Sequence, residues 1–295
     1  MRVCVIEPIG IPSAEIEAGL PGHEVVSFDS RGWSDDRLLS ACAGADVIAV
    51  TYRELSAAVI NGLPQLKMIA VAFAGIDHVD PAAAARGIVV RNAAGYADTA
   101  VAELVLGFML CLARDIPRHN SEIRAGGTAT VGTELRGKTV GIVGTGAIGS
   151  RVSELTSAFG MTTLPFDRDS TIPLSEIFAQ SDFVTIHVPL NPGTRGMVSA
   201  ELLAAMKPTA FLINCARGPI VDAEALRAAL AAGQLAGAAL DVFDVEPPLP
   251  VDNPLLAFPN VLATPHIGFD TSEALVEKGR LALAHIQEFF QSRGH

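Results

Sequence analysis

Short segments of uniformly apolar residues recur along the chain, and they constrain its fold more than any other feature. In the first third of the chain these segments cover residues 3–7, 25–28, 47–51, 68–72 and 88–91. Strands that are covered on both faces have continuous apolar sequences, and helical stretches separate these segments at about 35–43, 57–61 and 81–86. Such a strand–helix–strand alternation predicts a parallel sheet with right-handed crossovers.

A second series of the same kind follows a long helix, which we expect at about 98–114 with Asp98 or Thr99 as its cap. Pro165 removes a hydrogen-bond donor from the second strand of this series, which argues against a strand at 162–166. A last helix with apolar residues at helical spacing is expected at about 272–291. The expected strands of the second series are 139–143, 162–166, 183–188, 210–214, 238–242 and 261–264.

Composition excludes several classes of protein. Of 295 residues, 49% are hydrophobic and 18% charged, which supplies a large core and rules out disorder. The net charge of −11, without a basic run, argues against nucleic acids and anionic membranes as partners. The longest apolar stretch, 101–113, is interrupted by Glu103 and is shorter than the roughly 18 residues that a membrane span needs.

The N-terminus and the cysteines indicate a cytoplasmic protein. Glu7 and Pro8 interrupt the apolar N-terminal run, so we expect no signal peptide. The four cysteines lie far apart in the sequence and have no metal-ligand spacing, so we expect reduced thiols and no metal site.

A glycine-rich loop is the sharpest local signal. Gly144, Gly146 and Gly149 form a GxGxxG motif directly after an apolar strand and directly before a helix. The first glycine permits a tight turn, the second lets a pyrophosphate approach the backbone, and the third lets helix and strand pack closely. The exposed N–H groups and the positive end of the helix favour an anion. A glycine-rich turn alone often marks only a tight bend, but this strand–turn–helix context predicts dinucleotide binding.

Asp167 strengthens this interpretation. It ends the next expected strand, 18 residues after Gly149. A carboxylate there can accept hydrogen bonds from the adenosine ribose and would repel a 2′-phosphate, which favours NAD over NADP. The adjacent Arg168 could reduce that preference, and Asp167 could alternatively only cap a loop.

Three polar residues follow later strands of the second series. Arg217, Glu246 and His266 each come at or just after an expected strand, and open α/β sheets bind ligands at the carboxyl ends of their strands. Arginine supplies a planar fork for a carboxylate, and histidine exchanges a proton near neutral pH. A glutamate bonded to the second ring nitrogen would orient the imidazole and raise its pKa. Taken singly, such a histidine is often an ordinary surface or core residue, and such a glutamate often only caps a turn.

With these motifs in place, nearly the whole chain resembles the D-isomer-specific 2-hydroxyacid dehydrogenase family. The resemblance implies an α/β fold of two doubly wound parallel-sheet domains with the active site between them. Residues 96–268 would form a Rossmann dinucleotide-binding domain, and residues 1–95 and 269–295 a flavodoxin-like substrate-binding domain. The implied reaction is hydride transfer between NAD(H) and a small 2-hydroxy or 2-keto acid. The further matching segments are 74–80, 101–103, 187–190, 206–208, 214–218, 240–247 and 264–268.

The resemblance also implies roles for individual residues. Arg217 would hold the carboxylate and keto oxygen of the substrate, and His266, paired with Glu246, would give or take the hydroxyl proton. Gly75 and Ile76 would meet the carboxylate through their N–H groups. Cys215 otherwise fits as a small packing residue, and we expect no nucleophilic thiol there. Residues 187–189 would border the adenine side, or are only an ordinary strand end. The implied cofactor-binding residues are Thr99, Gly144, Gly146, Ala147, Ile148, Gly149, Asp167, His187, Val188, Pro189, Cys215, Ala216, Asp241 and Gly268, with Cys215 and Asp241 at the nicotinamide.

Two departures from the family pattern bear on the ligands. Only residues 168–181 separate two strands, so we expect a trimmed adenine side. Members that act on 3-phosphoglycerate resemble one another in carrying an arginine in the strand before the Gly75 segment, where this chain has Val-Ala-Phe-Ala at 71–74. We therefore expect glyoxylate, hydroxypyruvate, pyruvate or a larger 2-keto acid in place of a phosphorylated substrate. Tyr52 and Phe73 would form an apolar wall for it, or serve only as core residues.

The apolar helix at 101–113 lies in a region that contributes to a twofold dimer in the family, so we expect a homodimer. Burial between the chain's own domains is the competing explanation.

An NAD-responsive binding protein of the corepressor type is the alternative function, because such proteins share the fold and the Arg/Glu/His set. A 3-phosphoglycerate dehydrogenase is a second alternative. Formate dehydrogenases carry Gln where Glu246 stands, and a hydrolase would need a GxSxG motif, which this sequence does not contain.

Overall fold

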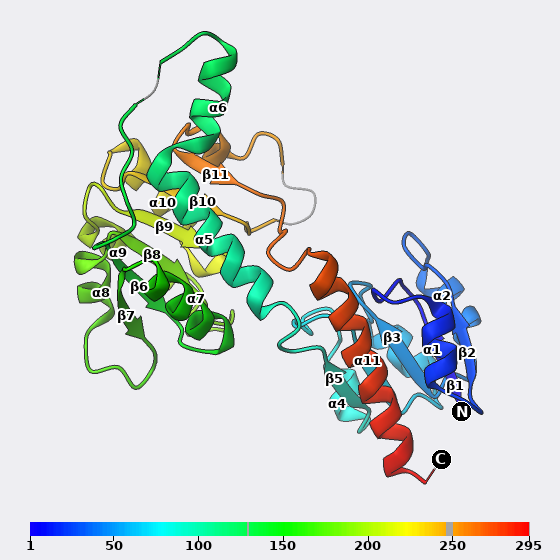
Figure 1. The fold of residues 1–295 in the computed structure, drawn as a ribbon. Coiled ribbons are helices and arrows are strands. Elements are labelled where there is room, and N and C mark those ends of the chain that lie inside the picture. Colours follow the sequence, from blue (N-terminus) through cyan, green and yellow to red (C-terminus); the bar gives the residue numbers. More distant parts are fainter. Residues whose placement is uncertain (129, 246–249, 295) are drawn as a thin grey trace. The chain divides into compact units, whose positions relative to one another are not determined.

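The computed structural model describes residues 1–128, 130–245 and 250–294, which divide into two units (Figure 1). The first unit combines Met1–Ala97 with Asp270–His295, and the second is Asp98–Phe269. Each unit has its own parallel sheet, so the expected α/β fold with two parallel sheets is confirmed.

The first unit is built on a five-stranded sheet in the order β2-β1-β3-β4-β5, the order of flavodoxin-like folds. In every strand except β2, alternate residues enter two separate cores, one shared with α1 and α11 and the other with α2, α3 and α4. Both faces are therefore covered, which explains the uninterrupted apolar sequences of these strands. Its elements are β1 (Arg2–Val5), α1 (Ser13–Gly19), β2 (Glu24–Ser27), α2 (Asp35–Ala41), β3 (Val47–Val50), α3 (Ala57–Gly62), β4 (Met68–Val71), α4 (Ala82–Ala85), β5 (Val89–Asn92) and α11 (Ser272–Ser292).

Local signals fix the ends of these helices and the docking of the last one. The hydroxyls of Ser34, Ser56 and Thr271 cap α2, α3 and α11 by accepting a backbone N–H. Gly10 has a φ of +100°, and a Cβ at this position would lie 1.8 Å from the Leu275 carbonyl oxygen in α11. Only glycine lets the loop after β1 pass so close to the helix that closes this unit.

The second unit is built on a six-stranded sheet in the order β11-β10-β9-β8-β6-β7. The strand order reverses at β6, whose neighbours are β7 and β8, and such a reversal opens a crevice at the carboxyl ends of the strands. Its elements are α5 (Asp98–Arg114), α6 (Ile116–Arg124), β6 (Thr139–Val143), α7 (Ala147–Ala158), β7 (Thr162–Phe166), α8 (Leu174–Gln180), β8 (Phe183–Ile186), α9 (Ala200–Ala205), β9 (Phe211–Asn214), the 3-10 turn η1 (Gly218–Ile220), α10 (Ala223–Ala231), β10 (Gly237–Leu240), the 3-10 turn η2 (Pro254–Ala257) and β11 (Val261–Ala263).

Most expected elements are confirmed, with ends that differ by one or two residues. β6 and β7 have the expected bounds, and Pro165 is tolerated in β7 because this strand lies at the edge of its sheet. The helices α1 and α6 were not predicted, and no range was predicted for α8 and α9 in the second series. Among the described helices, none is both long and apolar enough to cross a membrane.

Candidate active site

The glycine loop joins β6 to α7, and its three glycines face different surroundings. A Cβ on Gly144, whose φ is +102°, would lie 2.6 Å from the His187 carbonyl oxygen, and a Cβ on Gly149 would lie 1.9 Å from the Gly144 carbonyl oxygen. These two positions are therefore glycine because of the fold. Gly146 is exposed and its Cβ would meet no protein atom within 4 Å. The open space at the N-terminus of α7 fits a group that approaches the backbone closely, such as a diphosphate.

Asp167 follows β7 directly and lies beside this loop, because β6 and β7 are paired. Its Oδ2 accepts a hydrogen bond from the Thr145 hydroxyl at 2.8 Å. Its Oδ1 accepts from the Asp169 N–H at 3.0 Å and from the Ser170 hydroxyl at 3.2 Å. These hydrogen bonds, led by that of Thr145, lower the pKa of Asp167. An exposed, ionised carboxylate is thus held next to the glycine loop.

The segment after β9 positions Arg217. Asn214 is buried, and its side chain accepts from the Ala216 N–H at 3.0 Å and donates to the Arg217 carbonyl at 2.9 Å. The guanidinium of Arg217 is half-buried and donates to the Ala216 carbonyl at 2.7 Å. A Cβ on Gly218 would lie 2.1 Å from the Phe243 carbonyl carbon, so the segments after β9 and β10 run in close contact.

Asp241, directly after β10, organises the turn that carries His266. The carboxylate is 1% exposed. Its Oδ1 accepts from the Thr264 hydroxyl at 2.6 Å and from the Ile267 N–H at 2.8 Å, and its Oδ2 accepts from the Gly268 N–H at 2.8 Å. The N–H of His266 itself donates to the Asp241 carbonyl at 2.8 Å.

This turn holds His266 with a φ of +57°, in the left-handed region. Among the described residues, Asp115 is the other non-glycine residue with a positive φ. Such a conformation costs a side-chain-bearing residue about 1–2 kcal/mol and persists only when its surroundings impose it. The imidazole packs edge-on against Phe269, with 5.5 Å between ring centres. Arg217 and His266 thus follow β9 and β11, the two neighbours of β10, at the same edge of the sheet.

Two further residues implied at the cofactor are held in uncharged form. Burial lowers the pKa of His187 to about 4, and its Nε2 lies 2.9 Å from the Thr185 hydroxyl. Burial, together with the charge of Asp241, raises the pKa of Cys215 well above its ordinary value. The imidazole is therefore neutral and the thiol protonated near pH 7.

The remaining implied residues lie at various depths. In the second unit, Thr99 is exposed in the first turn of α5, and Pro189 is exposed after β8. In the first unit, Ile76 is 46% and Tyr52 49% exposed, and the Tyr52 ring lies 5.0 Å from that of Phe73. Glu246 lies outside the described residues. The others are the exposed Ala147, the half-buried Ile148, Val188, Ala216 and Gly75, and the buried Gly268.

Sequence reasoning missed the residue that fixes the Tyr52 loop. The buried carboxylate of Glu7 accepts, through one oxygen, the N–H groups of Thr51, Tyr52 and Arg53 at 2.9, 2.7 and 2.8 Å. Three N–H groups on one oxygen orient the loop after β3 firmly. The available signal was a glutamate at the end of an apolar run, because a charge that is buried there needs hydrogen-bond partners of this kind.

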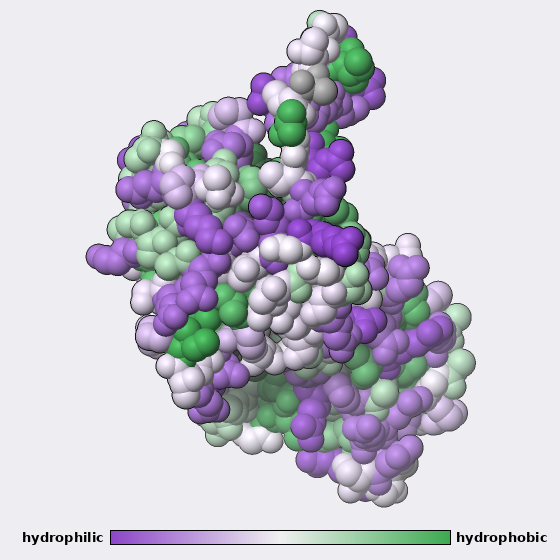
Figure 2. All heavy atoms as spheres, turned by 60° about the vertical axis from the view of Figure 1, so that its left-hand side comes forward, coloured by the Kyte–Doolittle hydropathy of each residue, from purple (hydrophilic) through white to green (hydrophobic). Residues whose placement is uncertain are grey.

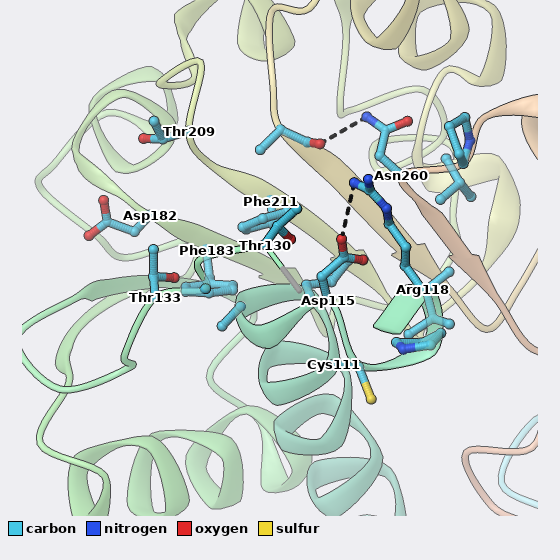
Figure 3. Close-up of a pocket in the computed structure, with 18 of the residues that line it drawn as sticks. Cys111, Asp115, Arg118, Thr130, Thr133, Asp182, Phe183, Thr209, Phe211 and Asn260 are labelled. Carbon is cyan, nitrogen blue, oxygen red and sulfur yellow. Dashed lines mark hydrogen bonds and ion pairs between the residues drawn. The ribbon is translucent and has the colours of Figure 1, made fainter. Parts of the chain in front are cut away.

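A cavity of about 850 Å³ lies at the opposite, amino edge of the second sheet (Figure 3). It is open to solvent and lined by the end of α5, the start of α6 and the residues that precede β8, β9 and β11. Arg118 pairs with Asp115 at 3.5 Å within its wall, and Asn260 donates to the Ala236 carbonyl at 2.8 Å. Of the implied catalytic and cofactor residues that the structure describes, none lines this cavity.

Comparison with known proteins agrees with this geometry. The family model for the D-isomer specific 2-hydroxyacid dehydrogenase, NAD binding domain, matches residues 106–268. The D-3-phosphoglycerate dehydrogenase of Methanocaldococcus jannaschii is 36% identical over 98% of this chain, which spans 57% of that protein's length. The hydroxypyruvate reductase of Thermotoga maritima is 35% identical over 99% of this chain and 98% of its own. The crystal structure of the TT0316 protein of Thermus thermophilus superposes with a TM-score of 0.88 at 35% identity, covering 99% of this chain and 97% of that one.

Proposed function

The chain belongs to the D-isomer specific 2-hydroxyacid dehydrogenases, NAD-dependent oxidoreductases of 2-hydroxy and 2-keto acids, and we propose that Arg217, Glu246 and His266 carry the reaction here. The observation that supports this most is the strained His266 turn, held by buried Asp241 at the sheet edge that also carries Arg217. A left-handed histidine is costly, and such strain accumulates at functional sites.

NAD fits the second unit. The open space at Gly146 would admit the diphosphate, and the Asp167 carboxylate would accept a ribose hydroxyl. Bound NAD(H) would supply or accept the hydride. Cys215, with its raised pKa, stays a thiol and takes no part as a nucleophile.

The chain's own residues would then bind the acid and move one proton. Arg217 would hold the substrate carboxylate through its planar guanidinium. In the reducing direction, protonated His266 would donate its proton to the oxygen that becomes the hydroxyl, and in the oxidising direction neutral His266 would accept it. We assign Glu246 the role of orienting the imidazole. Gly75, Ile76 and Tyr52 of the first unit are proposed to contribute to substrate binding.

The proposed substrate is a small 2-keto or 2-hydroxy acid without a phosphate group. Val71 ends β4, and Ala72, Phe73 and Ala74 follow it without a cation. Arg53, the nearby arginine, is engaged elsewhere, because its guanidinium donates to the Trp33 carbonyl at 2.7 Å and to Asp35 at 2.6 Å. A segment without a cation of its own, whose nearby arginine is already paired, is a poor site for a phosphate dianion.

Oxidation of NADH with a panel of 2-keto acids tests this function. We expect turnover of glyoxylate, hydroxypyruvate, pyruvate or a larger 2-keto acid, with NADPH less effective. His266→Ala should lower kcat by about 10²–10⁴-fold, the usual contribution of a general acid or base, while NADH binding survives. Tight NADH binding with no turnover of any acid would support the alternative, an NAD-responsive binding protein. Efficient turnover of 3-phosphohydroxypyruvate would contradict the phosphate-free substrate.

We also infer a homodimer, in which a second copy covers α5 and α6. The helix α5 buries Val101, Val105, Phe108 and Met109, while Leu104, Leu106, Leu110 and Leu112 on its other sides are only half-buried. None of the residues of α6 is buried. Ile116 is 48% and Ile123 71% exposed, and Val131 after α6 is fully exposed.

The views of the molecule agree with an uncovered surface on this segment. In Figure 1, α6 continues away from the sheet beyond α5, and in Figure 2 apolar side chains appear at the surface of this upper segment. This exposed apolar surface lies beside the cavity of about 850 Å³, and we propose that the twofold dimer buries it. We place the protein in the cytoplasm, where its four free cysteines would stay reduced.

Sedimentation velocity tests the dimer. The unsubstituted chain should sediment as a dimer at micromolar concentration. Ile123→Asp should shift it to a monomer, because a carboxylate would be buried unpaired in the interface. The control is Ile172→Asp, the same change at an isoleucine that is 41% exposed outside α5 and α6, and it should leave the dimer intact. A monomeric unsubstituted chain would overturn the inference.

A further inference from the structure

We propose that this chain selects its dinucleotide by the adenosine ribose and hardly by the base, with Thr145 and Ser170 acting as positioning residues for Asp167. The inference rests on the proposed function and concerns the same cofactor site. It combines two independent observations, the order of strands in the second sheet and the hydrogen bonds of the Asp167 carboxylate.

The second sheet ends at the strand that presents Asp167. In the common dinucleotide-binding order 3-2-1-4-5-6, the strand that carries the ribose-binding acid is flanked by a further strand. Here the corresponding order is 2-1-3-4-5-6, and in the described part of the chain no strand pairs with the outer edge of β7 (Figure 1). The connection from β7 to β8 contains a single helix, α8, of 7 residues.

The connection after Asp167 offers little surface on which a purine could be buried. Arg168, Asp169, Thr171 and Pro173 are exposed, and the one large apolar side chain among them, Ile172, is 41% exposed. Affinity gained from a base scales with the apolar area that it buries and with the polar groups that it satisfies. On this edge both contributions are small. After β8, Val188 is half-buried and Pro189 exposed, so that strand end also offers little enclosed apolar surface. A changed base should therefore alter affinity little.

The Asp167 carboxylate, in contrast, is already arranged to receive a ligand. An exposed aspartate ordinarily samples several rotamers, but here three donors fix it, and the Asp167 N–H donates back to the Ser170 hydroxyl at 2.8 Å. Oδ1 has two donors and is saturated, whereas Oδ2 has only the Thr145 hydroxyl. Oδ2 is therefore the atom left to accept a ribose hydroxyl.

Thr145 also links the two halves of the site. It lies between Gly144 and Gly146, so the residue that orients the ribose acid belongs to the loop proposed to hold the diphosphate. Preorganisation of this kind raises affinity by reducing the ordering cost of binding. The fixed negative charge at the same point would repel a 2′-phosphate. Ribose discrimination is thus concentrated in Thr145, Asp167 and Ser170.

Equilibrium binding followed by nucleotide fluorescence tests the proposal without any turnover. NADH, NADPH and deamino-NADH, which carries hypoxanthine in place of adenine, are titrated against the full chain. We expect the Kd of deamino-NADH to lie within about threefold of that of NADH, and the Kd of NADPH to be at least about tenfold higher. Thr145→Ala should raise the Kd of NADH about fivefold, the effect of one net hydrogen bond. The Kd of NADPH should rise less, so the ratio of the two Kd values (the NADH/NADPH ratio) should move toward one.

Two further variants separate positioning from folding. Thr145→Ser keeps the hydroxyl and should restore both the Kd and the ratio. Thr162→Ala makes the same type of change at the far, amino end of β7 and should leave both unchanged. Thermal melts of all variants verify that each is folded.

The outcomes distinguish this inference from the proposed function. If the unsubstituted chain does not bind NADH, the proposed function itself fails. If it binds NADH but binds deamino-NADH more than tenfold more weakly, base recognition is real and the inference is overturned. If folded Thr145→Ala keeps the NADH/NADPH ratio of the unsubstituted chain, Thr145 has no positioning role.

Discussion

Replacing Asp241 by Asn removes one charge from the turn that holds His266 while it preserves the shape of the side chain. The carboxylate is 1% exposed and accepts three hydrogen bonds, from the Thr264 hydroxyl at 2.6 Å and from the N–H groups of Ile267 and Gly268 at 2.8 Å each. An amide has a single acceptor oxygen, so its NH₂ group must replace one carboxylate oxygen. In either orientation that NH₂ group faces a backbone N–H.

The structure sets the size of the effect. One charge-assisted hydrogen bond, worth about 1.5–3 kcal/mol, is lost, and one buried N–H is left unsatisfied. The Thr264 hydroxyl can rotate and accept a hydrogen bond from the amide NH₂ group, so its bond need not be lost. We therefore expect Asp241→Asn to lower the free energy of unfolding by about 2–4 kcal/mol. Because the left-handed His266 depends on this turn, kcat should fall more than NADH affinity.

Urea denaturation, steady-state turnover and NADH titration measure these quantities on one preparation. Asp252→Asn is the matched control, since Asp252 is exposed in the same unit, and it should change the free energy of unfolding by less than about 0.5 kcal/mol. If Asp241→Asn unfolds at the urea concentration of the unsubstituted chain and turns over at its rate, the carboxylate does not hold His266 and this reasoning is wrong.

Two other predictions concern the glycine loop and His187. Gly146→Ala should fold normally but lose NADH affinity, whereas Gly149→Ala should fail to fold, because its Cβ would lie 1.9 Å from the Gly144 carbonyl oxygen; circular dichroism and NADH titration distinguish the two. The pKa of His187 is lowered from 6.5 to about 4, so the unfolded chain binds the proton first as pH falls. Its contribution to stability should be complete above about pH 6.5 and lost toward pH 4, and His187→Gln should make the measured pH profile flatter in that window.

The strands were predictable because burial on both faces leaves a strong record in the sequence. Every strand of the first sheet except β2 has an apolar run that fills two separate cores, and the bounds of β6 and β7 match the expected ones. The helix α1 has no side-chain cap, and α6 buries none of its residues. Neither helix therefore carries the capping residue or the buried stripe by which a short helix is identified in a sequence.

The cofactor loop could be found from the sequence because nearby backbone requires glycine at positions 144 and 149. The hydrogen bonds that hold His266 could not be found in this way. Asp241 and its partners lie 23 to 27 residues apart, and a histidine with a positive φ has no signature in composition. What joins them is the pairing of β10 with β11, in which Leu240 lies opposite Ala263 and so brings Asp241 beside Thr264. If that register shifted by one residue, a different set of hydrogen-bond donors would lie opposite the Asp241 carboxylate. The orientation of the proposed catalytic imidazole is therefore a property of the register of the sheet, and only secondarily of the residues next to His266.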